Sequence, residues 1–443
     1  MANVIKLRKG LDINLKGKAA SDKLPLKAVE EIALVPDDFV GVVPKVVVRE
    51  GDHVKAGEAL FVNKNCPEVK FASPLSGTVT AIERGERRKV LCVKVKADAQ
   101  PSAVDFGRRD ASALSGEEVR KALLDAGLFG YINQLPYAVS TTPDTTPKAI
   151  FVSALRDMPL AGDFEVELEG NEDAFQAGLT ALGKVAKTYL GIGAHQTAGA
   201  LVQARDVEVN VFDGPCPAGN VGVQVNHLSP VWTVDPTAVI FFGRLMLTGK
   251  VDLRRTVALA GSRMTVTGYV EALVGTPLKT LLDGRVDTAG DTRIINGNPL
   301  TGRRATLADY LGAHTSEVTA LPEGDHADEL LGWIMPRTGQ FSTSRSYFSW
   351  LLGKREYDLD ARLKGGERHL IMSGEYDKVL PMDIYGEYLI KAIISGDIDK
   401  QEQLGIYEVG PEDFALAEFV DSSKLELQKI VREGLDILRK ENA

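Results

Sequence analysis

The feature that most constrains the fold is a loop rich in glycine and proline near the middle of the chain. Val207, Val209 and Val211 alternate with polar residues, which predicts a strand. The sequence that follows, GPCPAGNVG, is too dense in glycine and proline for a helix or a central strand, so we expect a shaped loop. Turn chemistry leaves two interpretations open, a rigid turn between strands or a platform whose backbone lies against a ligand or a partner chain. The candidate contact residues of such a platform are Gly214, Pro215, Pro217, Gly219, Asn220 and His227.

Length and charge restrict the class of protein. The chain has 443 residues, with 61 Asp and Glu against 52 Lys and Arg and a formal net charge of −9. It is long enough for several domains with real cores, and its charge balance argues against a nucleic-acid partner. The first residues carry charges where a signal peptide needs an apolar run, and apolar clusters such as 238–242 are far shorter than the roughly 20 residues of a membrane span. We therefore expect a soluble cytoplasmic protein with no direct membrane span.

Cysteine and histidine form no recognisable metal or catalytic motif. Cys66, Cys92 and Cys216 lie far apart in the sequence, which predicts neither a disulfide framework nor an iron–sulfur or zinc–thiolate site. The six histidines show no HExxH motif and no i, i+4 pair. We predict no catalytic residue and no metal ligand in this chain.

Hydrophobic patterning predicts a multidomain α/β protein. Alternating residues over 5–15 indicate two short strands joined by a turn, and Ser115 with Glu118 predicts a capped helix that ends at Gly127. Helices alternate with apolar strands in the middle of the chain, as in an α/β domain with a largely parallel sheet. The other predicted helices are 173–187, 382–395, 411–420 and 423–441, the last capped by Asp421 or Ser422. The predicted parts are an N-terminal β segment (1–32), an all-β domain (33–97), a Rossmann-like α/β domain (98–250), a β-rich domain (251–310) and a mostly helical region (311–443).

Two segments of the all-β part, EGDHVKAGEAL and SPLSGTV, resemble the two halves of biotinyl and lipoyl carrier domains. The resemblance implies a barrel-sandwich hybrid. In those carriers a modified lysine stands at a hairpin tip, which here corresponds to Asn65-Cys66-Pro67, with Lys64 and Lys70 nearby. No lysine stands at the tip, so we predict the fold without the carrier function and keep a carrier as an alternative. The β-rich part around residues 254–282 similarly resembles the soluble-ligand-binding β-grasp (SLBB) module.

The order of these parts resembles the A subunits of sodium-translocating NADH:quinone reductases. The resemblance rests on IKLRKGLDINLKG at the start, on the two barrel segments, and on the loop FDGPCPAGNVGVQVNHLSPV. A more distant resemblance joins residues 115–443 to the flavin subunit of respiratory complex I and to the C subunit of the Rnf complex. The family implies a peripheral subunit on the cytoplasmic face of the bacterial inner membrane, with the B to F subunits as partners. It also implies that FMN or FAD, riboflavin and iron–sulfur clusters belong to those other subunits.

The chain departs from the flavin subunits at their glycine-rich loop. Those subunits have a loop of the type GLRGRGGAGFPTG against FMN and NADH, whereas residues 127–137 here read GLFGYINQLPY. Bulky side chains replace most of the glycines, and only glycine permits such close backbone approach. Their acidic NADE-type segment appears here as VSALRD (152–157), and their cluster cysteines have no counterpart after Cys216. We predict no flavin or iron–sulfur cluster in this chain; the alternative is a flavoprotein that itself oxidises NADH.

A cleft without a flavin can admit another apolar ring, and the family makes quinone, ubiquinone in particular, the candidate. The loop offers aromatic faces and amide donors that suit a quinone head group, from Tyr131, Asn133, Gln134 and Tyr137. The alternative is that these side chains only fill the space of the lost flavin.

A basic and aromatic stretch near the C-terminal third is a candidate docking surface for a membrane subunit. The alternative is an amphipathic segment packed on its own domain. Its residues are Arg337, Arg345, Tyr347, Phe348, Trp350, Lys354 and Arg355.

Overall fold

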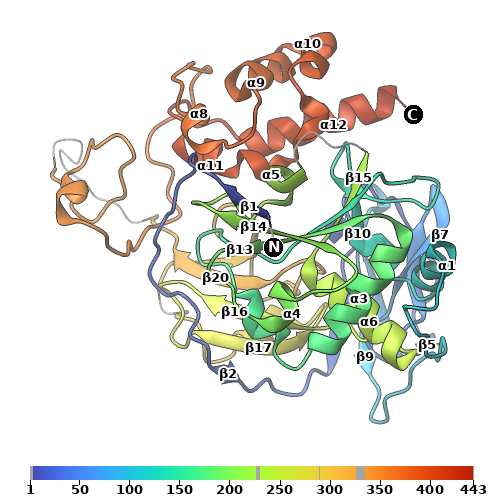
Figure 1. Ribbon diagram of the computed structural model, residues 1–443. Coiled ribbons are helices and arrows are strands. Elements are labelled where there is room, and N and C mark those ends of the chain that lie inside the picture. The colour runs from blue at the N-terminus through green and yellow to red at the C-terminus, as the bar shows by residue number, and fades with distance from the viewer. Residues whose placement is uncertain (1–2, 226–229, 289, 326–334, 443) are drawn as a thin grey trace.

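The computed structural model describes residues 3–225, 230–288, 290–325 and 335–442. These residues form four β-sheets and a group of C-terminal helices that packs against them (Figure 1). In the described part of the chain, no helix has both the length and the apolar character needed to cross a membrane.

The central element is a seven-stranded, mostly parallel sheet. Its strands are β1 (Asn3–Lys6), β10 (Ile132–Leu135), β11 (Val139–Ser140), β12 (Ile150–Ser153), β13 (Thr188–Gly193), β14 (Glu208–Asp213) and β15 (Val231–Val234). They lie in the order β1-β14-β13-β12-β15-β10-β11. Strand β10 pairs in antiparallel fashion with both β15 and β11, and the other neighbouring strands of this sheet pair in parallel. The chain steps outward from β12 to β13 and β14, then returns to the other side of β12 at β15. The strand order therefore reverses between β12 and β15, and such a reversal is where open α/β sheets bind ligands.

Helices cover this sheet, among them the two that the sequence predicted in this region, over 115–127 and 173–187. They are α1 (Gly116–Asp125), α2 (Phe164–Leu168), α3 (Glu172–Val185), α4 (Gly199–Val202), α5 (Val221–Val225) and α6 (Pro236–Thr248). The predicted capping box of α1 is present, because Ser115 Oγ accepts from the Glu118 amide and the Glu118 carboxylate accepts from the Ser115 amide. One detail was wrong: the glycine-rich loop is shorter than expected, since Gly222 lies inside α5.

The N-terminal barrel region forms two facing sheets that share a core with the α/β domain. One sheet has the order β3-β9-β8-β5 and the other β4-β6-β7; their bounds are β3 (Glu31–Leu34), β4 (Pro44–Val46), β5 (His53–Val54), β6 (Ala59–Asn63), β7 (Cys66–Ala72), β8 (Gly77–Arg84) and β9 (Val90–Ala97). The rings of Phe61 and Phe71 stack at 4.7 Å, and Phe39 lies 4.4 Å from Phe71 and 5.2 Å from Tyr131. This aromatic row connects the barrel to β10.

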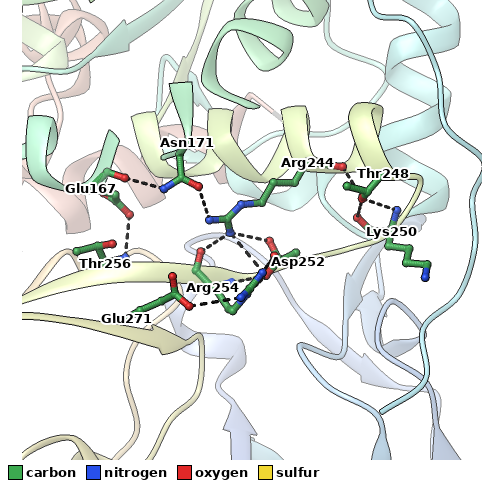
Figure 2. Close-up of polar contacts among 9 residues, drawn as sticks. All are labelled: Glu167, Asn171, Arg244, Thr248, Lys250, Asp252, Arg254, Thr256 and Glu271. Atoms are coloured by element: carbon green, nitrogen blue, oxygen red, sulfur yellow. Dashed lines mark hydrogen bonds and ion pairs between the residues drawn. The ribbon is translucent and has the colours of Figure 1, made fainter. Parts of the chain in front are cut away.

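A six-stranded sheet lies below the α/β domain in Figure 1. Its members are β2 (Lys23–Leu24), β16 (Arg254–Ala260), β17 (Gly268–Leu273), β18 (Thr292–Asn296), β19 (Arg303–Ala305) and β20 (Glu317–Pro322), with α7 (Leu278–Leu281) beside them. The order is β19-β18-β20-β16-β17-β2, so β20, from the stretch expected to be mostly helical, lies between β18 and β16. Arg244 of α6 donates to the Arg254 carbonyl (2.6 Å) and to Asn171 Oδ1 (2.7 Å), which ties this sheet to α3 and α6 (Figure 2).

The C-terminal helices are α8 (Tyr376–Val379), α9 (Gly386–Ser395), α10 (Ile398–Gln403), α11 (Ala415–Val420) and α12 (Leu427–Glu441). The predicted helices are present, but the predicted cap of the last one is wrong. Helix α12 begins only at Leu427, after Glu426, with no side-chain cap. Asp421 instead accepts hydrogen bonds from the amides of Ser423 and Leu425, so its carboxylate shapes the preceding turn.

The hairpin predicted for the first 15 residues is not formed. Strand β1 pairs in parallel with β14, and the chain then runs on extended, so that the Leu11 amide donates to the Cys216 carbonyl (2.8 Å). Further along, β2 pairs with β17 in the six-stranded sheet. The alternating apolar residues reflect burial of this segment against distant elements, and not a local strand pair.

Candidate functional site

A cavity of about 400 Å³ lies at the strand-order reversal, beyond the carboxyl ends of β12 and β15. Several parts of the molecule line it. The α/β domain contributes Asn133 of β10 and residues 153–158 and 233–236 at the ends of the two strands, together with 219–221 of the glycine-rich loop. Residues 296–303 and 314–317 come from the region of the six-stranded sheet, Asp38 from the barrel region, and Glu412 from the segment before α11. The site therefore lies where the α/β domain, the six-stranded sheet and the C-terminal helices meet.

Arg156 forms the charged floor of this cavity. Its guanidinium contacts Glu167 Oε2 (3.0 Å) and donates to Thr237 Oγ1 (2.9 Å), with Asp235 Oδ1 at 3.8 Å. The side chains of Arg156 and Glu167 are only 11% and 3% exposed. Burial opposes ionisation of Asp235, but the guanidiniums of Arg156 and of the buried Arg255 outweigh it and lower the Asp235 pKa. The two arginines therefore favour the charged form of the Asp235 carboxylate.

Carboxyl groups outnumber basic groups around the cavity. Burial raises the pKa of Asp157 to about 6 and raises the pKa of Glu317, although Arg156 opposes the shift at Glu317. Burial also lowers the pKa of His314 to about 4, so the imidazole is neutral at pH 7. The carboxyls are Asp38, Asp157, Asp235, Glu317 and Glu412, and the other cavity-lining basic residues are Arg156 and Arg303. Such a lining favours a neutral or cationic polar ligand over an anion.

The glycine-rich loop closes one side of the cavity through close backbone contacts. The Gly219 amide donates to Asp157 Oδ2 (2.9 Å), and a Cβ on Gly219 would lie 2.4 Å from the Leu155 carbonyl oxygen. A Cβ on Gly222 would lie 2.2 Å from Asp413 Oδ2. Neither Gly219 nor Gly222 has φ in the left-handed region. The close approach of neighbouring atoms is therefore what requires glycine at these two positions.

Other loop residues face the N-terminal segment. A Cβ on Gly214 would lie 2.7 Å from the Leu7 carbonyl oxygen, Pro215 lies against Gly10, and the Cys216 amide donates to Asp12 (3.0 Å). The Cys216–Pro217 peptide is cis. Of the six candidate contact residues, Gly219 and Asn220 line the cavity, while His227 lies outside the described residues.

Comparisons with known proteins match three successive segments of the chain. Residues 5–98 match the family model of the NqrA N-terminal barrel-sandwich hybrid domain, residues 114–251 that of the NqrA second alpha/beta domain, and residues 256–306 that of the NQRA C-terminal domain. The A subunit of the Na(+)-translocating NADH-quinone reductase of Photorhabdus laumondii is 34% identical, over 99% of this chain and 100% of that protein. The corresponding A subunit of Rhodopirellula baltica is also 34% identical, over 99% of both chains.

The chain belongs to the NqrA family. The predicted fold class is confirmed with it, including the barrel-sandwich hybrid, the α/β domain and the SLBB-type domain. Among solved structures, an NAD+-reducing [NiFe]-hydrogenase in the H2-reduced state aligns with 76% of this chain and 59% of its own at 12% identity, with a TM-score of 0.31. That score supports no inference about fold or function.

The structure does not bring the four candidate quinone residues of this NqrA chain together. Tyr131 is buried between Phe39, Phe241 and His314, and its hydroxyl has no hydrogen-bond partner among the residues that the structure describes. Asn133 lines the cavity, whereas Gln134, next along β10, accepts from Thr141 Oγ1 (2.8 Å). Tyr137 lies against Tyr407 near the C-terminal end.

The two glycines that remain in the 127–137 loop pack against the barrel. A Cβ on Gly130 would lie 2.3 Å from the Phe71 ring, and one on Gly127 would lie 2.9 Å from the Ala72 amide nitrogen. Both contacts are with β7. In this NqrA chain these glycines therefore allow the barrel and the α/β domain to pack closely against each other.

The charged residues of the cavity were not predicted as a site. Arg156 and Asp157 appeared in the sequence only as a changed acidic segment, and Asp235 and Glu317 did not stand out. A signal was present, since Arg156 and Asp235 each follow a strand of the parallel sheet and the carboxyl ends of such strands meet at one edge. Finding the pair required the strand order, which the sequence alone did not supply.

Proposed function

We propose that this chain is the A subunit of a sodium-translocating NADH:quinone reductase. In this role it is a peripheral component on the cytoplasmic face of the bacterial inner membrane, and it contributes to assembly and to quinone binding. The observation that carries the proposal is the match to proteins named as this component over 99% of the chain and the full length of the relatives. The partners are the B to F subunits, which hold the flavins, the riboflavin and the iron–sulfur centre, and whose membrane-spanning parts provide the sodium path.

The proposal assigns no flavin to this chain, and the charges around the cavity support that assignment. FMN carries a phosphate dianion, which α/β proteins usually bind at a helix N-terminus beside a strand end. Here Asp235 occupies that position at α6, where its Oδ1 accepts from the Thr237 amide (2.9 Å). The Asp235 carboxylate at the helix N-terminus, whose pKa Arg156 and Arg255 lower, would repel a phosphate.

For quinone, the proposal centres on Asn133. Quinone carbonyl oxygens only accept hydrogen bonds, and the Asn133 amide is a neutral donor on the cavity wall beside Thr233 and His314. Tyr131 supports this wall from behind, because its ring lies 5.5 Å from the His314 ring. In the assembled complex, Asn133→Leu should raise the KM for quinone with little change in the KM for NADH. Gln134→Leu, on the opposite face of the same strand, is the matched control, and an unchanged quinone KM in Asn133→Leu would refute the quinone site.

The role in the complex is tested by affinity purification of this chain from gently solubilised membranes. The expected eluate contains flavin-bearing membrane subunits and shows sodium-stimulated NADH:quinone reduction. A chain that elutes alone, yellow and able to oxidise NADH, would refute the proposal in favour of the flavoprotein alternative.

A further inference from the structure

The segment 335–355 concentrates exposed apolar side chains on one short turn. The 3-10 turn η5 (Phe348–Leu352) exposes Phe348 (56%), Leu351 (62%) and Leu352 (56%), and Trp350 beside them is 46% exposed. In Figure 1 the orange segment that contains this turn projects from the side of the molecule, away from the central sheets. Monomeric proteins rarely expose several large apolar residues next to one another without a contact to make.

We name this turn the apolar tip (Phe348–Leu352). Contacts with other residues of the same chain hold it in place. Phe341 packs edge-on against Tyr357 at 5.3 Å and lies 5.9 Å from Phe419 of α11. The Phe348 amide donates to the Pro336 carbonyl (3.1 Å), and Ser349 is buried. The exposed side chains are therefore presented by an anchored loop.

Positive charge surrounds the apolar tip. Residues 335–355 contain Arg337, Arg345, Lys354 and Arg355 and no Asp or Glu, within a chain whose net charge is −9. The Arg345 guanidinium lies 5.1 Å from the Trp350 ring centre, so cation and aromatic ring share one surface. The local charge is opposite in sign to that of the whole molecule.

We propose that the apolar tip inserts into the interfacial region of a bilayer that contains anionic phospholipids. Aromatic and leucine side chains enter the boundary between headgroups and acyl chains, while arginine and lysine remain at the headgroup phosphates. The competing occupant is a protein partner, since protein interfaces are also enriched in aromatic residues and arginine; the experiment below separates the two. The inference deepens the peripheral location proposed above and rests on it, and it gives this chain a lipid contact that does not depend on other subunits.

The test is flotation of the full chain with vesicles of phosphatidylethanolamine and phosphatidylglycerol at low salt. We expect binding to these vesicles, little binding to phosphatidylcholine vesicles, and loss of binding as salt rises. The double change Leu351→Ser and Leu352→Ser should abolish flotation. Arg345→Gln with Lys354→Gln should weaken binding by about thirtyfold, since each cation near an anionic surface contributes roughly fivefold.

A matched control changes two exposed isoleucines elsewhere, Ile394→Ser (54% exposed) and Ile437→Ser (49%), and should float like the original chain. Tip variants that bind as well as the original chain, or an original chain that does not bind anionic vesicles, would overturn the proposal. In another outcome, the original chain shows no vesicle binding while the tip variants lose co-purification with membrane subunits. That result would assign the apolar tip to a protein partner and would also overturn the lipid proposal. Failure to bind vesicles with intact co-purification refutes the lipid contact alone and leaves the proposed role in the complex standing.

Discussion

Replacing Arg156 by methionine should destabilise the region around the cavity more than any other single change there. The guanidinium makes a 3.0 Å ion pair with Glu167, a 2.9 Å hydrogen bond to Thr237 and a ring contact with Phe164 at 5.1 Å. Removing one partner of a buried ion pair costs about 3–5 kcal/mol, because the other charge remains buried and unpaired. Glu167 keeps hydrogen bonds from Thr237 Oγ1 (2.9 Å) and the Thr256 amide (3.2 Å), so we expect about 3 kcal/mol, near the lower limit.

A double-mutant cycle separates the ion pair from packing. Glu167→Gln alone should cost about 2 kcal/mol, since the amide retains the Thr256 contact but leaves Arg156 with the longer, 3.8 Å ion pair to Asp235. In the double variant, Arg156→Met with Glu167→Gln, neither position carries a buried, unpaired charge. It should therefore cost about 2–3 kcal/mol, less than the sum of the two single losses, about 5 kcal/mol.

The appropriate measurement is the local opening free energy from hydrogen exchange of α6 and β15, because a chain with several domains does not unfold in a single two-state step. The expected coupling energy is about 2–3 kcal/mol. A loss below about 1 kcal/mol for Arg156→Met, or strictly additive losses in the double variant, would refute the claim that this ion pair organises the cavity floor.

Three further predictions concern single residues outside this ion pair. Gly130→Ala should lower stability by about 1–3 kcal/mol, because the new methyl would meet the buried Phe71 ring at 2.3 Å; an unchanged melting temperature would contradict this. Ser115→Ala should cost about 1 kcal/mol and speed amide exchange in the first turn of α1, whereas Ser115→Asp should restore most of it. Burial raises the Asp413 pKa from 3.8 to about 6, so the folded state binds the proton more tightly than the unfolded chain. The stability due to this proton is complete below about pH 4 and is lost as pH rises through about 6, so the C-terminal helices should resist proteolysis better at pH 5 than at pH 8. Burial also raises the pKa of the neighbouring Glu412 to about 7, so Asp413→Asn should remove part of that difference, and Asp413→Asn with Glu412→Gln most of it. Equal pH dependence in the double variant would argue against it.

Several features followed directly from the sequence because their causes are local. The capping box at Ser115 needs only a partner three residues away, and α3 needs only an apolar stripe at helical spacing. The strand that ends at Asp213 and the loop after it follow from alternation and from the density of glycine and proline. Family membership also came from the sequence, since short motifs and their order carry it.

Other features depended on contacts between residues far apart in the chain. The same alternation that predicted a hairpin over residues 5–15 is equally satisfied by β1 pairing with β14, and nothing local distinguishes the two. Tyr131 and Asn133 are two residues apart, yet one is buried in the aromatic row beside Phe39 and the other faces the cavity. The direction of each side chain follows from its neighbours in the sheet and barrel.

The sequence by itself determined the fold class, several helices and strands, the family, and the position of a loop rich in glycine and proline. Only the tertiary structure decided that this loop packs on the N-terminal segment and on Asp413, and that Arg156 bonds to Thr237 across 81 positions of sequence. The physical reason is that local signals report hydrogen bonding and rotamer preferences within one or two turns. A buried ion pair is favourable only once strand order and domain packing have excluded water around it, and that order is a property of the whole fold.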